Sequence, residues 1–501
     1  MRQKALAVLA AAVLGLSACA GDGGAGAAGE STLRWAVTLP AHWDPVVSGS
    51  GAQFRILSLA YASLTEIDEH GKAVPNLAQS WDYNDKGDQV TFHLRPGLRF
   101  SDGEPLNAAA VKAYLERAKT QENSALDGDL TSIESVTAQG DLDVVIQLTQ
   151  VDHQIPLLLG ERVAQITSPK AAQDPAKLDQ SPVGAGPFVV TELVPGSHVY
   201  LRKNPDYWDA ANIHIDRVEL QTAPDAATVV SGLKTGVYDF ANLTASQVKA
   251  AEAAGLDVVF QPGFNASNIS INVNKAPFTN PKVVDAVRYA TNRQEFVDKV
   301  TFGYGKATDQ PFPPEYLAYD QRSANRYPYD PEKARSLLAE AGYAPGQLKL
   351  DLVIAGQTYA TASEIVQSQL NAVGFDITIK VDPNWEKPFF AKDLALSLYG
   401  TTGRESPVQT LTAHFGPNGP LNLSTPYQPE GFEKAVSLAR GTPLDSPDYA
   451  KNLQAATRAG LESRALVFTY SQPNIFVKSR KVSAITPIPG QIHWTGLKVE
   501  P

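Results

Sequence analysis

The sequence contains a single cysteine, Cys19, among its 501 residues. An intrachain disulfide is therefore impossible, and the fold must be held together without one. A block of basic residues is also absent: Lys and Arg number 43 against 53 Asp and Glu, so the formal net charge is −10. This balance excludes nucleic acid as an expected partner, because binding to phosphates depends on concentrated positive charge.

No apolar run reaches the roughly 20 residues that a bilayer-spanning helix needs. A shorter apolar run follows Arg2 and Lys4 and ends at "LSAC" (16–19). A basic start, an apolar stretch and small residues at the end are typical of a secretory signal. Because "LSAC" resembles the bacterial lipobox, we expect residues 1–18 to be a lipoprotein signal peptide and Cys19 to be lipidated. A buried free cysteine is the alternative.

Residues 19–30 are mostly Gly and Ala. Such residues bury too little apolar area to order a segment, so we expect a flexible tether between the lipid and a folded body. The expected location is the extracytoplasmic face of the cell membrane. The remaining length is too great for one ordinary core and predicts two or three domains.

Hydrolase signatures are missing, because neither Gly-x-Ser-x-Gly nor His-Glu-x-x-His occurs. "SGLKTG" (231–236) contains both Ser-x-x-Lys and Lys-Thr-Gly, but the two share Lys234, whereas penicillin-binding enzymes place them on separate elements. The loop with Ser101, Asp102 and Glu104 contains no His or Lys base, so we interpret it as scaffold. We expect no enzyme, and a secreted serine hydrolase is a remote alternative.

Helical and strand patterns alternate along the chain. "YDPEKARSLLAEAGY" (329–343) predicts a helix that is capped by Asp330, begins at Pro331 and ends before Gly342. "LKLDLVIAG" (348–356) and "FDITIKV" (375–381) alternate as strands do, on either side of the helical "SEIVQSQLNAVGF" (363–375). Asn107 is a plausible N-cap of another helix. This order predicts an α/β fold with helices on a sheet.

Five segments together resemble a known family. They are "YASLTEIDEHGKAVPNLAQSW" (61–81), "LRPGLRFSDG" (94–103), "SPVGAGPFVVTELVPGSHVYLRKNPDYW" (181–208), "INVNKAPFTNPKVVDAVRYATNRQEFV" (271–297) and "YDPEKARSLLAEAGY" (329–343). In this order they resemble the solute-binding proteins of ABC importers, family 5, the peptide/nickel/opine class.

The resemblance implies a two-lobed periplasmic-binding-protein-like fold with an extra domain inserted in the first lobe. Lobe I would comprise residues 31–54, 180–272 and 476–501. The inserted domain would be residues 55–179, and lobe II residues 273–475. The chain would cross between the lobes at hinge strands, near "INVN" and "NIFV", and a ligand would sit in the cleft between the lobes.

The resemblance also implies ligand-binding residues. Peptide-binding relatives carry an aromatic wall and an aspartate that pairs with the ligand amino group, and "LSLYGTTGRESP" (396–407) is the matching stretch. Tyr399 falls on the aromatic, but Thr402 and Gly403 stand where the aspartate would be, followed by Arg404. Since Arg binds carboxylates bidentately and keeps its charge, this stretch disfavours the usual clamp on a peptide amino terminus.

Four further positions are implied in the same way. Arg162 matches an arginine that grips a ligand carboxylate in nickel-chelate binders, and Trp385 matches an aromatic that lines the peptide pocket. Phe54 falls near a ligand-contacting position, and Trp43 precedes the family's Asp-Pro. Each has a structural alternative: core or rim packing for the tryptophans, and a solvated surface cation for Arg404.

Two arginines with aromatic walls predict a ligand that has at least one carboxylate and a flat or apolar body. A peptide or peptide-like compound is expected, and an opine-type metallophore or metal chelate is the alternative. We expect no cofactor and no dedicated metal site, because His, Cys and carboxylates are not clustered. The expected partners are an ABC permease and ATPase and, through the lipid, the membrane. We expect a monomer that captures its ligand by closure, although delivery to a sensor or a cell-wall enzyme is open.

Overall fold

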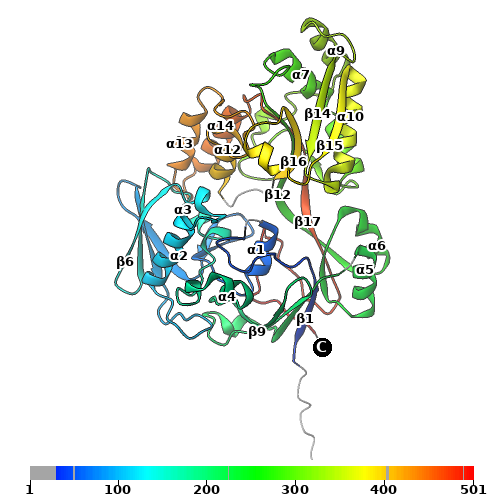
Figure 1. The fold of residues 1–501 in the computed structure, drawn as a ribbon. Coiled ribbons are helices and arrows are strands. Elements are labelled where there is room, and N and C mark those ends of the chain that lie inside the picture. The colour runs from blue at the N-terminus through cyan, green and yellow to red at the C-terminus, as the bar shows by residue number, and fades with distance from the viewer. Residues whose placement is uncertain (1–29, 49–50, 224, 402–405, 489, 501) are drawn as a thin grey trace, which may run out of the picture.

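The computed structural model describes residues 30–48, 51–223, 225–401, 406–488 and 490–500. The chain forms an upper body and a larger lower body that meet at two long strands (Figure 1). The described part of the chain contains no helix that is both long and apolar enough to cross a membrane.

One large sheet of eleven strands runs through both bodies. The spatial order is β15-β14-β16-β12-β17-β11-β1-β10-β9-β8, with β13 paired to β17. The strands are β1 (Thr32–Ala36), β8 (Phe188–Val194), β9 (His198–Lys203), β10 (Arg217–Gln221), β11 (Phe240–Leu243), β12 (Asp257–Ile271), β13 (Lys306–Ala307), β14 (Leu348–Ile354), β15 (Phe375–Val381), β16 (Leu396–Thr401) and β17 (Leu466–Lys478).

Two of these strands, β12 and β17, belong to both bodies. They pair antiparallel, and the register shifts between Gln261 and Asn265. On one side of this shift β17 pairs with β11, and on the other side β12 pairs with β16. The chain therefore enters the upper body before the "INVN" segment, near which the sequence placed the crossing. The position of the crossing depends on the strand partners of β12, which lie far along the chain.

We call the lower part of the sheet, from β11 to β8 in the spatial order, together with its helices, lobe I. The upper part, which contains β15, β14 and β16, together with its helices, is lobe II. In lobe I, β1 runs parallel to β10 and β11, and in lobe II, β14 runs parallel to β15 and β16. Helices cover these strands, so the expected two-lobed α/β architecture is confirmed.

The helices include several that the sequence located well. Asn107 accepts a hydrogen bond from the Ala110 N–H at 3.1 Å, and Gly374 ends the helix before "FDITIKV" with a φ of 116°. The helices are α1 (Gly51–Leu57), α2 (Ala108–Thr120), α3 (Ile155–Leu158), α4 (Pro175–Gln180), α5 (Ala226–Thr235), α6 (Val248–Ala253), α7 (Pro281–Ala290), α8 (Arg293–Lys299), α9 (Pro331–Glu340), α10 (Ala360–Val373), α11 (Glu386–Phe390), α12 (Pro407–Phe415), α13 (Phe432–Arg440) and α14 (Tyr449–Gly460).

A separate four-stranded sheet lies at the left of Figure 1, in the order β4-β5-β7-β6. It is built from β4 (Ala78–Tyr83), β5 (Gln89–Leu94), β6 (Ile133–Gln139) and β7 (Asp143–Leu148), and β2 (Thr65–Ile67) pairs with β3 (Ala73–Pro75) nearby. Alternate residues of β5 are buried, as a half-buried strand requires. We call this sheet, its helix α2 and the loops around them the side domain; all of it falls within residues 55–179.

The "SPVGAGP" segment joins the side domain to lobe I through two glycines. The Gly186 N–H donates to the Ala60 carbonyl at 3.0 Å, and a Cβ added at Gly186 would lie 2.5 Å from the Ala60 carbonyl carbon. Gly184 lies as close to Ala60. The two backbones touch, and only glycine leaves room for this contact.

We expect Gly186→Ala to lower the free energy of unfolding by about 1–3 kcal/mol, because the added methyl group must push the two backbones apart. Denaturant unfolding followed by circular dichroism measures the change. Gly128→Ala is the matched control, since no atom lies within 4 Å of the Cβ position there. Equal stability of both variants would contradict the assigned role of this contact.

Candidate functional site

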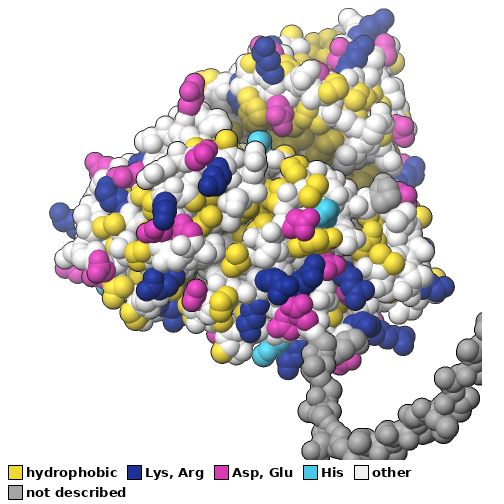
Figure 2. Space-filling view, turned by 60° about the horizontal axis from the view of Figure 1, so that its bottom comes forward, with side chains coloured by type: hydrophobic (Ala, Val, Ile, Leu, Met, Phe, Trp, Pro, Cys, Tyr) yellow, Lys and Arg dark blue, Asp and Glu magenta, His cyan; other side chains and the backbone are white. Residues whose placement is uncertain are grey.

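A cavity of about 450 Å³ lies against the paired strands β12 and β17, between the two lobes. We call it the hinge cavity. The space-filling view shows a deep hollow between the lobes with apolar side chains on its visible walls (Figure 2). The residues that line the hinge cavity are 242–246, 266, 267, 300–302, 304, 358, 359, 400, 470 and 472–475.

The topology of the sheet explains this position. Leu243 ends β11 in lobe I, and Gly400 lies at the end of β16 in lobe II. Both strands belong to parallel sets, and open α/β sheets bind ligands beyond the carboxyl ends of such strands. Because β12 and β17 hold these ends opposite each other, the cavity has one wall from each lobe.

Side-chain hydroxyl and amide groups form the polar surface of the hinge cavity, and aromatic rings form part of its apolar surface. Tyr359 accepts a hydrogen bond from the Gly400 N–H at 3.2 Å, and the Tyr304 ring stacks on Phe260 with centroids 5.2 Å apart. Burial raises the pKa of Tyr470 to about 12, and the Ser267 hydroxyl opposes this rise only in part. Tyr470 is therefore neutral at physiological pH.

Of the six ligand-binding residues predicted from the sequence, the structure brings Trp385 and Tyr399 together. Their rings stack with centroids 5.8 Å apart, and Phe389 packs edge-on against Tyr399 at 4.9 Å. The Tyr399 hydroxyl donates to the Leu421 carbonyl at 3.1 Å, and burial raises the pKa of Tyr399. These residues are not among those that line the hinge cavity, but Tyr359, which is, packs against their cluster.

Arg162 is buried and forms an ion pair with Asp129 within the side domain. It also donates to the Ala125 carbonyl at 3.3 Å. Asp129 in turn accepts a hydrogen bond at 2.5 Å from Gln409 on α12, so this carboxylate joins the side domain to the upper body. The positive charge of Arg162 is thus matched by a protein carboxylate. Arg404 lies outside the described residues.

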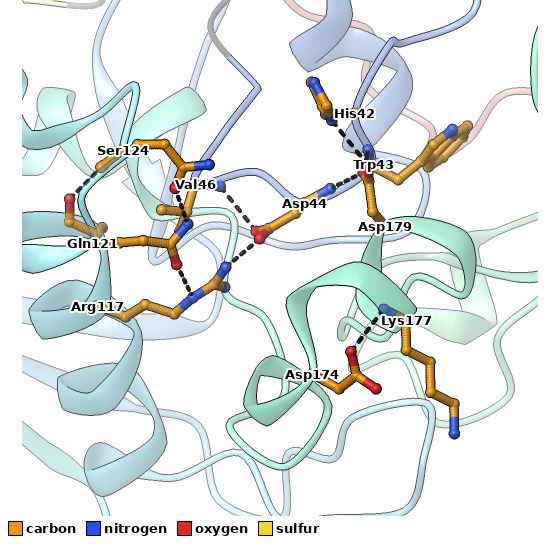
Figure 3. Close-up of polar contacts among 12 residues, drawn as sticks. His42, Trp43, Asp44, Val46, Arg117, Gln121, Ser124, Asp174, Lys177 and Asp179 are labelled. Atoms are coloured by element: carbon orange, nitrogen blue, oxygen red, sulfur yellow. Dashed lines mark hydrogen bonds and ion pairs between the residues drawn. The ribbon is translucent and has the colours of Figure 1, made fainter.

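Trp43 is held in place by its backbone. Its N–H donates to the Asp179 carboxylate, and its carbonyl accepts from the Tyr61 hydroxyl at 2.9 Å. Figure 3 shows the neighbouring Asp44 bound to Arg117 of α2, while the Trp43 ring points away from that pair. The ring is buried in the core of lobe I and the side domain. A ligand contact of Trp43 stays a prediction.

Phe54 is also buried, on α1. It lines a separate cavity of about 30 Å³, which also touches Gln491 and Trp494 near the C-terminus. A volume of this size accommodates about one water molecule and no solute. A ligand contact of Phe54 therefore stays a prediction without support from the hinge cavity.

The lower and upper bodies also meet away from β12 and β17, where the side domain contacts the upper body. We call this contact the second junction, and it was not foreseen from the sequence. Gln154 accepts hydrogen bonds from Tyr449 at 2.8 Å and from Ser406 at 3.2 Å, and the His153 N–H donates to the Arg440 carbonyl at 2.9 Å. This junction lies across the molecule from β12 and β17. No periodicity or motif marks "DHQ" (152–154) as an interface.

The hydrolase-like segments have structural roles. Asp102 accepts from Ser168 at 2.8 Å, and Glu104 pairs with Lys170 at 2.7 Å, so the loop is fastened to the chain that leaves the side domain. "SGLKTG" forms the end of α5 and its C-cap Gly236. Among the described residues no group of three or more His, Cys, Asp or Glu is placed to hold a metal ion.

Asp152 at the second junction provides a pH-dependent contribution to stability. Burial raises the pKa of Asp152 to about 6, and the Gln154 N–H at 2.9 Å and Arg440 oppose the rise. A raised pKa means that the folded protein holds an extra proton between about pH 4 and 6. This contribution is fully present below pH 4 and is lost as the pH rises through 6.

We expect the wild type to lose about 1–3 kcal/mol of stability relative to Asp152→Asn when the pH rises from 4 to 7, because the amide cannot ionise. Denaturant unfolding at several pH values measures the difference. Asp127→Asn, in an exposed turn of the side domain, is the control. Parallel pH profiles for the wild type and Asp152→Asn would contradict the raised pKa.

Comparison with known proteins agrees with this architecture. Residues 72–422 match the family described as bacterial extracellular solute-binding proteins, family 5. Di/tripeptide-binding protein 3 of Pseudomonas aeruginosa (strain UCBPP-PA14) is 30% identical over 402 residues, which cover 73% of this chain and 75% of that protein. Glutathione-binding protein GsiB of Salmonella typhi is 31% identical over 343 residues, which cover 67% of this chain and 66% of that protein.

Solved structures show the same fold. DppA from Helicobacter pylori, in complex with the peptide STSA, superposes with a TM-score of 0.82 at 22% identity and covers 94% of this chain and 98% of its own. AgaA from A.tumefacien R10, in complex with agropinic acid, gives a TM-score of 0.81 at 23% identity, with 94% and 99% covered. The chain therefore belongs to the bacterial extracellular solute-binding proteins of family 5, as its sequence motifs indicated.

Proposed function

We propose that this protein captures its solute in the hinge cavity and closes lobe II over it. As a member of family 5, the chain binds a peptide or another small solute for an ABC importer. The observation that carries the proposal is the placement of the cavity. It lies on β12 and β17, the strands that continue through both lobes, and takes a wall from each lobe.

The mechanism follows from this placement. A solute that touches both walls at once favours the closed arrangement by the difference between its affinities for the closed and open forms. Closure removes water from the cavity. The side domain contacts the upper body through Gln154 and Asp129 in the structure as it stands. The closed form then docks on the permease. Binding of the solute requires no bond making or breaking by this chain, and we propose no catalytic residue.

The names of similar proteins bear on the ligand. They bind dipeptides and glutathione, and one solved relative holds agropinic acid, so small amino-acid derivatives support the proposal of a peptide-like ligand. The carboxylate-binding role proposed for Arg162 has less support, because Asp129 already pairs with it. Arg404 stays a proposed contact. Tyr399 and Trp385 also stay proposed, although they do not line the hinge cavity themselves and reach it only through Tyr359, which packs against their cluster.

An opine-type metallophore or metal chelate is the second candidate. Similar solved structures support it, since AgaA holds agropinic acid, and NikZ from Campylobacter jejuni and NikA from Staphylococcus aureus hold complexes of nickel with L-His.

The proposed assembly is a monomeric lipoprotein attached through Cys19. The described chain begins at the lower end of the molecule in Figure 1, beside β1 and opposite lobe II. A tether at this end leaves the lobes free to close and keeps the protein near its permease, which raises the effective concentration. We propose the division into residues 31–54, 180–272 and 476–501, an inserted 55–179, and 273–475 as the working domains.

We expect Cys19→Ser to move the protein from the membrane fraction into the extracytoplasmic soluble fraction, because the thiol is the proposed lipid attachment point. Cell fractionation with immunoblotting measures the distribution. Solute binding should be unchanged, which separates anchoring from folding. Membrane retention of Cys19→Ser would contradict the anchor.

Filling the hinge cavity tests the binding site. Thr358 is exposed and lines the cavity, so Thr358→Trp should abolish retention of the co-purified solute without disturbing the core. Native mass spectrometry of the protein from its own source, followed by denaturing release, measures the retained solute. Thr378→Trp, at an exposed position of β15 in the same lobe, is the matched control. Full retention by Thr358→Trp would contradict capture in this cavity.

A further inference from the structure

We infer that the second junction contains a binding site for a small oxyanion, centred on Arg440. The site is a cavity of about 340 Å³, which we call the junction cavity, and its walls come from both the lower and the upper body. The junction cavity and the hinge cavity have no described lining residue in common. This inference therefore stands apart from the capture of solute in the hinge cavity.

Arg440, the last residue of α13, supplies a guanidinium group that the protein leaves incompletely bonded. Its side chain is only 14% exposed and lines the junction cavity. Its one ion pair within the described chain is with Asp152, at 3.9 Å, which is too long for a hydrogen bond. A guanidinium carries five N–H donors in a planar fork. These donors need acceptors that the described residues do not provide.

Gln154 brings a second donor to the same cavity, from the lower body. The residue is 3% exposed, and its Oε1 accepts hydrogen bonds from Tyr449 and Ser406. Its Nε2 is buried and has no hydrogen-bond partner among the described residues. A buried polar atom without a partner indicates a missing group. Arg440 and Gln154 thus both lack an acceptor, and they lie on different bodies.

An oxyanion supplies acceptors to both side chains at once. Arg binds carboxylates and phosphates through two parallel N–H···O bonds and keeps its own charge. The helix α12 also begins at this wall, where Ser406 caps it and Val408 lies in its first turn. The positive end of a helix dipole favours an anion. The volume of the cavity lies in the range of small-molecule sites.

Gln409 favours a carboxylate with a neighbouring hydroxyl group over a tetrahedral anion. It lines the junction cavity, and its Nε2 donates to Asp129, which fixes the orientation of the amide because a carboxylate only accepts. The Gln409 Oε1 is buried and has no partner in the described part of the chain. A hydroxyl donor on the ligand would satisfy this oxygen. Lactate has both groups.

Two carboxylates in the cavity wall oppose an anion to different extents. Asp129 is already bound by Arg162 and Gln409. Asp152 is the nearest charge to Arg440 and competes with an anion for it. Burial raises the pKa of Asp152 to about 6, against the opposing effects of the Gln154 N–H and Arg440. Binding of an anion is therefore linked to protonation of Asp152.

The sign of this linkage follows from the competition. Protonated Asp152 no longer competes for Arg440 and gains an O–H that can donate to the anion. A fall in pH through 6 therefore strengthens anion binding. Tyr83 and Tyr449 lie near Asp152 and stay neutral, because burial raises the pKa of both. Burial lowers the pKa of His153 despite Asp445, so its charge at pH 5 is the other variable, and an Asp152 variant separates the two.

The test uses the purified full chain and isothermal titration calorimetry. The probes are lactate, formate and sulfate, which all stay charged between pH 5 and 7, with chloride at the same ionic strength as the reference. We expect lactate to bind with a dissociation constant of about 1 mM at pH 7, more tightly than formate and sulfate. Its affinity should rise at least about threefold at pH 5. Tightest binding of sulfate would also support the oxyanion site and would assign it to tetrahedral anions.

Variants locate the binding. Arg440→Gln should weaken lactate binding at least about tenfold, and Arg440→Lys, which keeps the charge and the pairing with Asp152, should weaken it several-fold through loss of the fork. Arg464→Gln removes the same charge from an exposed position of the upper body outside the cavity, and it should bind as the wild type does. Asp152→Asn should bind more tightly than the wild type at pH 7 and lose the pH dependence.

Four results would overturn the inference. They are chloride binding as tightly as the oxyanions, equal affinities in Arg440→Gln and Arg464→Gln, a pH dependence that persists in Asp152→Asn, and loss of lactate binding in Thr358→Trp. The last result would place lactate in the hinge cavity. Retention of lactate by Thr358→Trp together with loss of the co-purified solute would instead support two separate sites.

Discussion

The backbone pairing of β12 with β17 is the constraint on which the rest of the structure depends. These two strands hydrogen-bond to each other through both lobes, and each also completes the sheet of one lobe. The ladder is interrupted between Gln261 and Asn265, where fewer backbone hydrogen bonds oppose bending. The carboxyl ends of β11 and β16 are held apart across this interruption, and the hinge cavity occupies the space between them.

Charge is distributed unevenly between the two junctions of the lobes. At the junction far from the hinge, Arg162 pairs with Asp129, and Asp152 lies 3.9 Å from Arg440. At the hinge cavity the described walls are neutral. Paired charges fix the geometry of an interface, whereas a neutral wall leaves the hydrogen bonding and shape of the solute to decide affinity. The paired charges at the second junction therefore orient the two bodies relative to each other, whereas the hinge cavity selects the solute.

Local sequence signals located many elements but only part of the site. The cap at Asn107, the start of α9 at Pro331 and the end of α10 at Gly374 depend on neighbouring residues, and the structure has them where the sequence placed them. Trp385 and Tyr399 were expected in one site and do stack, with Trp385 directly before α11 and Tyr399 within β16. The environment of Arg162 could not be foreseen, since its partner Asp129 is 33 residues away and belongs to no pattern.

The sequence by itself determined the class of the protein: its motifs identify family 5, its alternating patterns give an α/β fold, and its single cysteine rules out internal disulfides. Only the tertiary structure decided where a solute can sit and what it meets there. The walls of the hinge cavity come from segments that are spread over more than 200 positions of the chain. They are β11, the loop after α8, the turn before α10, β16 and β17. Strand pairing brings these segments together, and no local preference of the chain encodes which side chains then face one another.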